Sequence, residues 1–252
     1  MRIIRFICQT LSHVVSRLPS SVLSNFIYYT VFYHIRFLSL QQGVRFLMFL
    51  DSRLYLLHGN AAVKYGNGLH IKHRYMRYHD FFVHRIRPGE RVLDVGCGIG
   101  VVAYNIATKA GAEVTGIDLN ARNIIQAQEQ FRHEHICYRV GDVLTDLPDE
   151  RFDVVILSNV LEHIEDRVEF LRNLCRTVSP NRILIRVPLF ERDWRVPLKQ
   201  ELGVEYRLDP NHFIEYTHET FAAEINEAGM TIAYLESRWG EIWAEVIPSH
   251  GV

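Results

Sequence analysis

Residues 92–100 read VLDVGCGIG, an apolar run that reaches an acidic residue, Asp94, and then carries glycine at every second position. Residues 91–95 are rich in β-branched side chains and predict a strand, and residues 101–112 carry apolar side chains at helical spacing. The order is therefore strand, glycine turn, helix, which is the context of a nucleotide-binding turn. Three glycines remove side chains where a ligand must approach the main chain: Gly96, Gly98 and Gly100.

The spacing of the glycines separates two ligand classes. A dinucleotide-binding turn has the pattern G-x-G-x-x-G, in which the third glycine permits close helix packing, and Val101 stands at that position here. This weakens a nicotinamide-dependent oxidoreductase, which remains an alternative. The pattern present is D-x-G-x-G-x-G from Asp94 to Gly100, and here the chain resembles the class I S-adenosylmethionine-dependent methyltransferases.

The resemblance implies a cofactor, S-adenosyl-L-methionine, with S-adenosyl-L-homocysteine as its product. A second predicted strand ends at Asp118, where a carboxylate suits both ribose hydroxyls. A third precedes Asp142, which resembles the residue that receives the adenine amino group, and a fourth ends at Ser158, which should face the methionine part. The cofactor residues implied in this way are Asp94, Gly96, Cys97, Gly98, Gly100, Asp118, Leu119, Asp142, Val143, Ser158 and Asn159.

A second group of candidate cofactor residues lies ahead of the first strand. Residues 72–86 are rich in Lys, Arg and His and predict a helix with a basic face, for which a solvated surface is the ordinary interpretation. In similar methyltransferases this segment folds over the cofactor. The resemblance therefore implies a lid in which Tyr75, Tyr78 or His79 closes the site.

The chain has 252 residues, 48% of them apolar, which is enough for one large core, and strand and helix signals alternate along it. We expect an α/β fold: a Rossmann-like, seven-stranded, mostly parallel sheet with helices on both faces, plus an N-terminal helical extension. The expected boundaries are 1–60 for the extension and 61–252 for the methyltransferase domain, with 191–216 as an acceptor-side insert. After the insert, Thr217 predicts the N-cap of a helix.

The extension is basic and apolar. Six arginines stand against one acid, Asp51, so its net charge is near +5 (6 − 1), and the rest of a chain of net charge −1 is near −6. Residues 1–19 place polar and apolar side chains at helical spacing, the pattern of an interfacial helix, so we expect an anionic membrane surface as a partner. The alternative is a helical layer over the domain's own core. A membrane span over 22–40 is disfavoured because Arg36 lies within it.

Cysteine usage indicates the compartment and bears on metal binding. The four cysteines are isolated, which is typical of a cytoplasmic setting and argues against a zinc site. Together with the basic extension, this predicts a peripheral protein at the inner face of a membrane. Glu162 and His163 match the end of the E-x-x-E-H pattern that holds magnesium in some relatives, but Asn159 replaces the first glutamate. We therefore expect no metal unless the insert contributes His212 or Glu215.

The insert is too polar and irregular to read as core, and long loops of this kind are usually functional. It resembles, more loosely, inserts in bacterial methyltransferases of cell-surface glycan and lipid biosynthesis, in which an aromatic such as Trp194 beside charged groups would line a sugar. Methyl transfer to a hydroxyl uses a base, and the candidate catalytic residues are His212 and His163. Transfer without a base remains open.

The sequence thus predicts an S-adenosylmethionine-dependent O-methyltransferase acting on a sugar or lipid-linked glycan, as in polysaccharide biosynthesis, at the cytoplasmic face of a membrane. The alternative acceptor is the head group of a quinone or other prenyl lipid. A hypothesis of another class is a cofactor-binding interaction protein without catalysis. Nucleic acid is disfavoured because the domain is acidic and has no recognisable binding module. Homo-oligomerisation stays open.

Overall fold

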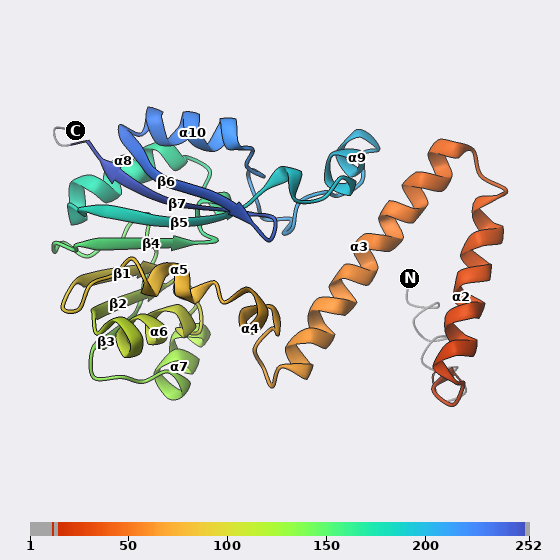
Figure 1. The fold of residues 1–252 in the computed structure, drawn as a ribbon, viewed down its shortest axis with the longest axis horizontal. Helices are drawn as coiled ribbons and strands as arrows, with labels where there is room; N and C mark the ends of the chain where they lie inside the picture. The colour runs from red at the N-terminus through yellow and green to blue at the C-terminus, as the bar shows by residue number, and fades with distance from the viewer. Residues whose placement is uncertain (1–11, 13–14, 250–252) are drawn as a thin grey trace.

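The computed structural model describes residue 12 and residues 15–249, and its centre is a seven-stranded sheet in the order β3-β2-β1-β4-β5-β7-β6 (Figure 1). Strands β1 to β5 pair in parallel, whereas β7 is antiparallel to both β5 and β6. The strands are β1 (Arg91–Val95), β2 (Glu113–Asp118), β3 (Ile136–Val140), β4 (Val154–Ser158), β5 (Arg182–Pro188), β6 (Met230–Arg238) and β7 (Glu241–Pro248). The expected Rossmann-like, mostly parallel sheet of the class I methyltransferases is confirmed.

Helices cover both faces of the sheet and extend beyond it. The α-helices are α2 (Ser20–Ile35), α3 (Leu40–Tyr65), α4 (Lys72–Met76), α5 (His79–Val83), α6 (Val101–Ala110), α7 (Ala121–Gln130), α8 (Arg167–Val178), α9 (Arg195–Glu201) and α10 (His218–Glu227). Two 3-10 helices follow β4 and β5: η1 (Leu161–His163) and η2 (Phe190–Arg192). Thr217 is the N-cap of α10, as predicted, because its hydroxyl accepts a hydrogen bond from the Thr220 amide at 3.1 Å.

Two cores form because successive side chains of a strand point to opposite faces. On β4, Val155 and Leu157 pack in the core beneath α8 and α10, whereas Val154 and Ile156 pack in the core beneath α5 and α6. The strand order reverses between β1 and β4, and ligands of open α/β sheets bind at the carboxyl ends of strands at such a point. The glycine turn after β1 and the 3-10 helix η1 after β4 both lie there.

Helices α2 and α3 form a hairpin beside the domain (Figure 1). Helix α3 continues past residue 60 to Tyr65, and α2 has no buried residue. Neither core cluster contains a described residue of the hairpin. Within the part of the chain that the structure describes, no helix is long and apolar enough to cross a membrane. Most of the predicted interfacial helix, residues 1–19, lies outside the described residues.

The hairpin joins the domain through the insert, which is more regular than its sequence suggested. Its helix α9 packs on α3, and the carboxylate of Asp51 accepts hydrogen bonds from Arg195 Nη1 and Lys199 Nζ, each at 2.7 Å. The tip of the β6–β7 hairpin lies nearby, because a Cβ added at Gly240 would come within 2.7 Å of Arg192 Cβ. That tip is a two-residue turn, Trp239 and Gly240, with φ of 58° and 77°, which is the geometry of a type I′ turn.

The basic segment before β1 also differs from its prediction. It is not one helix but two short ones, α4 and α5, separated at Arg77, whose φ of 47° is left-handed and cannot continue a helix. The break turns the segment, so that part of it faces the carboxyl end of β1.

Candidate active site

The glycine turn adopts backbone angles that favour glycine. Gly96, Gly98 and Gly100 have φ of 64°, 55° and 84°, in the left-handed region. The amide of Gly98 donates a hydrogen bond to Asp118 Oδ2 at 2.8 Å, which ties the turn to the end of β2. A Cβ added at Gly98 would meet no atom within 4 Å, so the main chain there faces open space that a ligand can enter.

A pocket of about 250 Å³ opens between this turn, the end of β4 and the segment before β1. It is lined by seven residues that the sequence predicted for the cofactor: Tyr78, Asp94, Gly96, Cys97, Gly98, Ser158 and Asn159. Three further polar residues that line it were not predicted: Lys72, His73 and Arg186. We call this the cofactor pocket.

Asp94 is the acidic residue of the pocket, at the carboxyl end of β1. Its side chain is only 1% exposed, and Oδ2 has no hydrogen-bond partner among the described residues. Burial raises the pKa of this carboxyl to about 7. A buried carboxylate oxygen without a partner is costly, so the site favours a ligand that brings positive charge or a donor to Oδ2.

A basic group stands opposite Asp94. Arg186 is buried on β5, where Nε and Nη2 each donate to a carboxylate oxygen of Glu241 at 3.0 Å, while Nη1 donates to Ser158 Oγ at 3.3 Å. Burial, and then the charge of Arg186, lower the pKa of Lys72, which begins α4. Glu241 neutralises only one of the two cations, so this end of the pocket can bind a carboxylate.

The structure brings one of the candidate lid residues to the pocket. Tyr78 is buried, its hydroxyl lies 3.1 Å from His73 Nδ1, and its ring lies 4.1 Å from the Arg186 guanidinium carbon. His79 and Tyr75 do not line the pocket. Burial lowers the pKa of His79 to about 3, so its ring is neutral and packs against the ring of Tyr78. Tyr75 is largely exposed.

The residues expected at the ribose and adenine lie beside the pocket at the same edge of the sheet. Asp118 Oδ1 accepts hydrogen bonds from Asn120 N at 2.8 Å and Asn123 Nδ2 at 3.1 Å, which orients the carboxylate at the end of β2. Asp142 follows β3, and its Oδ1 accepts from Leu144 N at 2.9 Å. Two apolar candidates, Leu119 and Val143, flank them. Leu119 is exposed and Val143 is half-buried.

The two candidate catalytic histidines, far apart in sequence, meet in the fold. His163 ends η1, His212 lies in the insert, and their ring centroids are 4.6 Å apart. The amide of Phe213 donates to the main-chain oxygen of Glu162 at 2.8 Å, which fixes the insert against η1. His163 is exposed whereas His212 is buried, and burial, and then the neighbouring His212, lower the pKa of His163.

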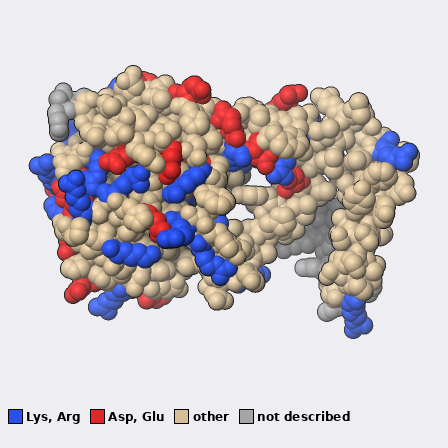
Figure 2. Space-filling view, viewed as in Figure 1, with Lys and Arg blue, Asp and Glu red and all other residues tan. Residues whose placement is uncertain are grey.

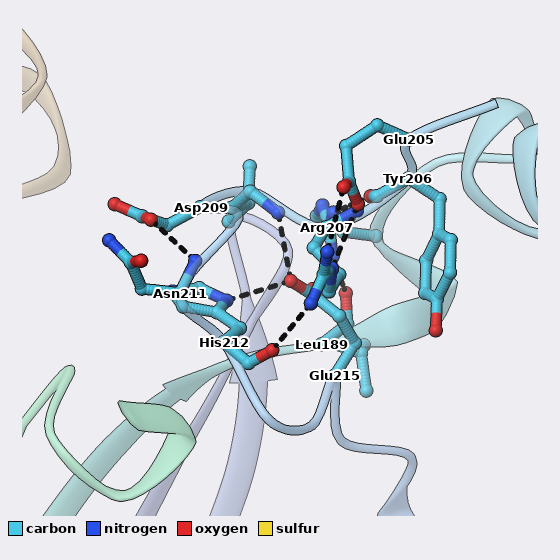
Figure 3. Close-up of polar contacts among 10 residues, drawn as sticks. Leu189, Glu205, Tyr206, Arg207, Asp209, Asn211, His212 and Glu215 are labelled. Atoms are coloured by element: carbon cyan, nitrogen blue, oxygen red, sulfur yellow. Dashed lines mark hydrogen bonds and ion pairs between the residues drawn. The ribbon is translucent and has the colours of Figure 1, made fainter. Parts of the chain in front are cut away.

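A carboxylate orients His212 (Figure 3). His212 Nδ1 lies 2.8 Å from Glu215 Oε1, and Glu215 also accepts hydrogen bonds from Leu208 N at 2.8 Å and from Arg192 Nη1. Burial opposes ionisation of Glu215, but the hydrogen bond from His212 and the charge of Arg192 prevail and lower its pKa. Because an ionised carboxylate only accepts, Nδ1 of His212 carries a proton, and in the neutral form of the ring the lone pair is on Nε2.

Glu162 completes the group. It is fully buried, neither carboxyl oxygen has a hydrogen-bond partner within the described ranges, and burial raises its pKa to about 8 against the opposing charge of Arg186. Ligand atoms of Glu162, His163 and His212 lie within 4.8 Å of one another, so together they could hold a divalent cation. His212 is thus placed where it could supply the ligand that the E-x-x-E-H pattern lacks. One lone pair on Nε2 serves either a cation or an acceptor proton, so these uses exclude each other.

The pocket fits S-adenosylmethionine in the chemistry of its donors and acceptors. Asp94 has a buried oxygen without a partner for the cationic part, and Lys72 with Arg186 supplies positive charge for the methionine carboxylate. Asp118 presents an oriented carboxylate, and the main chain at Gly98 is open. The fold and this site together define a class I S-adenosylmethionine-dependent methyltransferase.

Comparison with known proteins agrees with this class. Residues 93–185 match the family model described as a methyltransferase domain, which supports the class I S-adenosylmethionine-dependent methyltransferase family. It is 38% identical over 120 residues to a ubiquinone biosynthesis O-methyltransferase of Rhodopseudomonas palustris strain HaA2, an alignment that covers 47% of each chain. The chain thus spans about half the length of the curated relatives it matches.

Solved structures show the same fold at low sequence identity. The magnesium protoporphyrin IX methyltransferase of Synechocystis PCC 6803, crystallised with S-adenosylhomocysteine, superposes with a TM-score of 0.56 at 19% identity, over 69% of this chain and 84% of that one. A TehB-like S-adenosylmethionine-dependent methyltransferase of Corynebacterium glutamicum superposes with a TM-score of 0.53 at 17% identity, over 79% and 99%.

Proposed function

We propose that the protein is an S-adenosylmethionine-dependent O-methyltransferase whose acceptor is a hydroxyl on the head group of a quinone or other prenyl lipid. The observation that carries the proposal is the imidazole of His212, oriented by Glu215 and in contact with His163, at the edge of the sheet that also holds the cofactor pocket. A hydroxyl must lose its proton as it accepts a methyl group, and a neutral imidazole with a free Nε2 can take that proton.

The cofactor residues divide the ligand between them. Asp118 accepts hydrogen bonds from the ribose hydroxyls, and Asp142 accepts one from the adenine amino group. Lys72 and Arg186 pair with the methionine carboxylate. The bound cofactor supplies an electrophilic methyl carbon on a sulfonium. Tyr78 and the main chain of the glycine turn close the pocket around it, so the reacting carbon can be aligned with the acceptor.

The proton follows a defined route. Nε2 of His212 would take the acceptor proton as the acceptor O–H bond breaks, and the acceptor oxygen would receive the methyl group that the bound cofactor supplies, which would leave S-adenosylhomocysteine and an imidazolium. Glu215 stabilises that imidazolium through the hydrogen bond at Nδ1. His163, exposed beside His212, passes the proton to water.

The comparisons favour the quinone acceptor over the glycan acceptor, because the curated relatives are named for ubiquinone biosynthesis. Trp194, the aromatic residue expected to line a sugar, is 70% exposed, and the charged side chains Asp193 and Arg195 beside it pair with each other at 2.5 Å. Because these two side chains already form an ion pair, they are less available for hydrogen bonds to sugar hydroxyls.

A peripheral location at an anionic membrane surface belongs to the same proposal. Helix α2 exposes large aromatic side chains, among them Phe26 and Tyr29, and the hairpin surface carries few charges in Figure 2, with cations at its ends. Aromatic residues favour the membrane–water interface, and cations favour anionic lipids. Phe26→Ser should reduce flotation with phosphatidylglycerol vesicles, whereas Ile125→Ser, at a similarly exposed site on α7, should not. Equal flotation of both variants and the parent would contradict this location.

Transfer of a labelled methyl group to a water-soluble catechol, an ortho-dihydroxy analogue of the head group, tests the function. We expect turnover that His212→Ala lowers by about 100-fold or more, as for loss of a general base, with unchanged affinity for S-adenosylhomocysteine. A nitrocatechol, whose hydroxyl is already largely ionised, should recover most of the loss in the variant. Turnover with lipid-linked sugars alone would support the glycan acceptor, and tight cofactor binding without turnover on either acceptor would support a non-catalytic binding protein.

A further inference from the structure

A second pocket, of about 320 Å³, lies between the hairpin and the insert. Its walls come from Tyr55 and Leu56 on α3, Val196 on α9, Leu208 in the insert and Trp239 at the tip of the β6–β7 hairpin. It shares no lining residue with the cofactor pocket. We call it the α3–α9 pocket, after the two helices that face each other across it.

The charged groups around the α3–α9 pocket are already paired. Asp51 binds both Arg195 and Lys199 at 2.7 Å, and Arg207 Nη2 binds Glu205 at 2.8 Å. Arg192 binds Glu215, the carboxylate that orients His212. An ionic ligand would have to displace one of these partners, so the charges do not select an ion.

The aromatic and apolar side chains on the α3 and β6–β7 walls of the pocket, in contrast, are largely exposed to solvent. Leu56 is 59% exposed, Trp239 is 66% exposed and Tyr55 is 58% exposed, although all three face a cavity. Apolar surface in a concave site favours a ligand that removes it from water. These three side chains therefore offer a surface that a hydrocarbon group can cover, among charged groups that are already paired.

The pocket connects the catalytic edge with the hairpin. Arg207 Nη1 donates to the main-chain oxygen of His212 at 3.0 Å, and Leu208 N donates to Glu215, so the residues that wall the pocket also hold the base in place (Figure 3). On its other side the pocket is walled by α3, through Tyr55 and Leu56. A molecule with its head at His212 could extend its tail through this pocket toward the membrane-facing helices.

We infer that the α3–α9 pocket binds the hydrocarbon tail of the acceptor while the head group reaches the His163–His212 pair. This inference rests on the proposed function and adds to it that the acceptor is recognised at two places. The extension thereby forms part of the acceptor site, in addition to any contact with a membrane.

The test compares acceptors that share one catechol head and differ only in the tail: none, a ten-carbon prenyl chain, or a ten-carbon saturated chain, all below their critical micelle concentrations and without lipid. In the parent protein, a tail should raise kcat/KM by about tenfold or more. Leu56→Asp should remove that advantage, because the carboxylate enters the pocket, and should leave the rate with the tail-less acceptor unchanged. Leu57→Asp is the matched control, one residue along α3 and similarly exposed but outside the pocket, and should keep the advantage.

A preference for the prenyl over the saturated chain would identify an isoprenoid tail, and equal rates would identify any hydrocarbon tail. No effect of a tail in the parent, or equal losses in Leu56→Asp and Leu57→Asp, would overturn the inference. Sedimentation provides a further check: if Leu56→Asp converts a dimer to a monomer, the pocket is a self-association surface and the inference is wrong.

Tail binding can be measured without turnover. A brominated ten-carbon tail on a non-reactive methylated head should quench the fluorescence of Trp239 in the parent, and Trp239→Phe should remove that component. Quenching without methylation of any catechol would refute the proposed function and keep the tail site. Methylation without quenching would refute the tail site alone.

Discussion

Replacement of Lys72 tests the assignment of the methionine carboxylate. The ammonium group of Lys72 lines the cofactor pocket beside Arg186, and no hydrogen bond or ion pair of its side chain occurs within the described part of the chain. Lys72→Met keeps the length and apolar stem of the side chain and removes its charge. A hydrogen bond to a charged group contributes about 1.5–3 kcal/mol, so the affinity for S-adenosylhomocysteine should fall by roughly 10- to 150-fold. Arg186 remains, which keeps the expected loss toward the lower end.

Calorimetric titration with two ligands separates this contact from general damage. S-adenosylhomocysteine carries the amino-acid carboxylate, whereas 5′-methylthioadenosine has the same nucleoside without it. Lys72→Met should weaken only the first, and Lys109→Met, which removes an exposed lysine of α6, should weaken neither. Equal weakening of both ligands by Lys72→Met would show a distorted pocket, and no weakening of either would show that Lys72 does not bind the carboxylate.

Four further predictions concern the acidic residues of the site. Asp118→Ala should weaken cofactor binding by roughly 1–3 kcal/mol in calorimetry through lost charged hydrogen bonds, and unchanged affinity would refute the ribose assignment. Because burial raises the pKa of Asp94 to about 7, the folded chain holds a proton there that the unfolded chain releases near pH 4, so this group makes the protein less stable as the pH rises from about 4 to 7. The same protonation should reduce the affinity for S-adenosylmethionine by up to about tenfold per unit as the pH falls below 7, whereas a profile in Asp94→Asn that matches the parent would count against this role. Zinc, which prefers imidazole, should inhibit methyl transfer by occupying Glu162, His163 and His212, and Glu162→Gln should relieve the inhibition; activation by a cation would replace the base with a metal mechanism.

The sheet and the cofactor turn could be predicted because their signals are local. Val101 in place of a third glycine separates the two nucleotide classes, and the apolar run of β4 identifies a buried strand. The cap at Thr217 depends only on a hydroxyl three residues before a free amide. Each of these signals lies within a few residues of the element it predicts.

The basic end of the cofactor pocket could not be predicted, because its contacts join strands that are neighbours in the sheet but far apart in the sequence. Arg186 lies in the middle of an apolar run, and its partner Glu241 belongs to β7, which is antiparallel and 55 residues further along the chain. The break at Arg77 has no glycine or proline to mark it, yet it decides that Tyr78 rather than Tyr75 reaches the pocket. Side-chain periodicity carries no information of this kind.

The His163–His212 pair combines a local signal that the sequence shows with a contact that only the fold shows. The sequence predicted His163 just beyond the fourth strand and His212 in a polar insert, and each was a candidate by residue type. Their contact, and the role of Glu215 in orienting His212, depend on the insert folding back over η1 through the amide of Phe213. The shared site of Glu162 with these two rings follows from the same fold-back.

The link between Asp51 and helix α9 has a practical consequence for anyone who prepares this protein. The only acidic residue among the first sixty holds the long helix against the insert through Arg195 and Lys199. Trimming the N-terminal helices to improve solubility would remove one wall of the α3–α9 pocket. It would also remove the Asp51 carboxylate from Arg195 and Lys199 on the insert. A shortened enzyme that binds its cofactor normally could then accept a wider range of small phenols, and its selectivity would not represent that of the full chain.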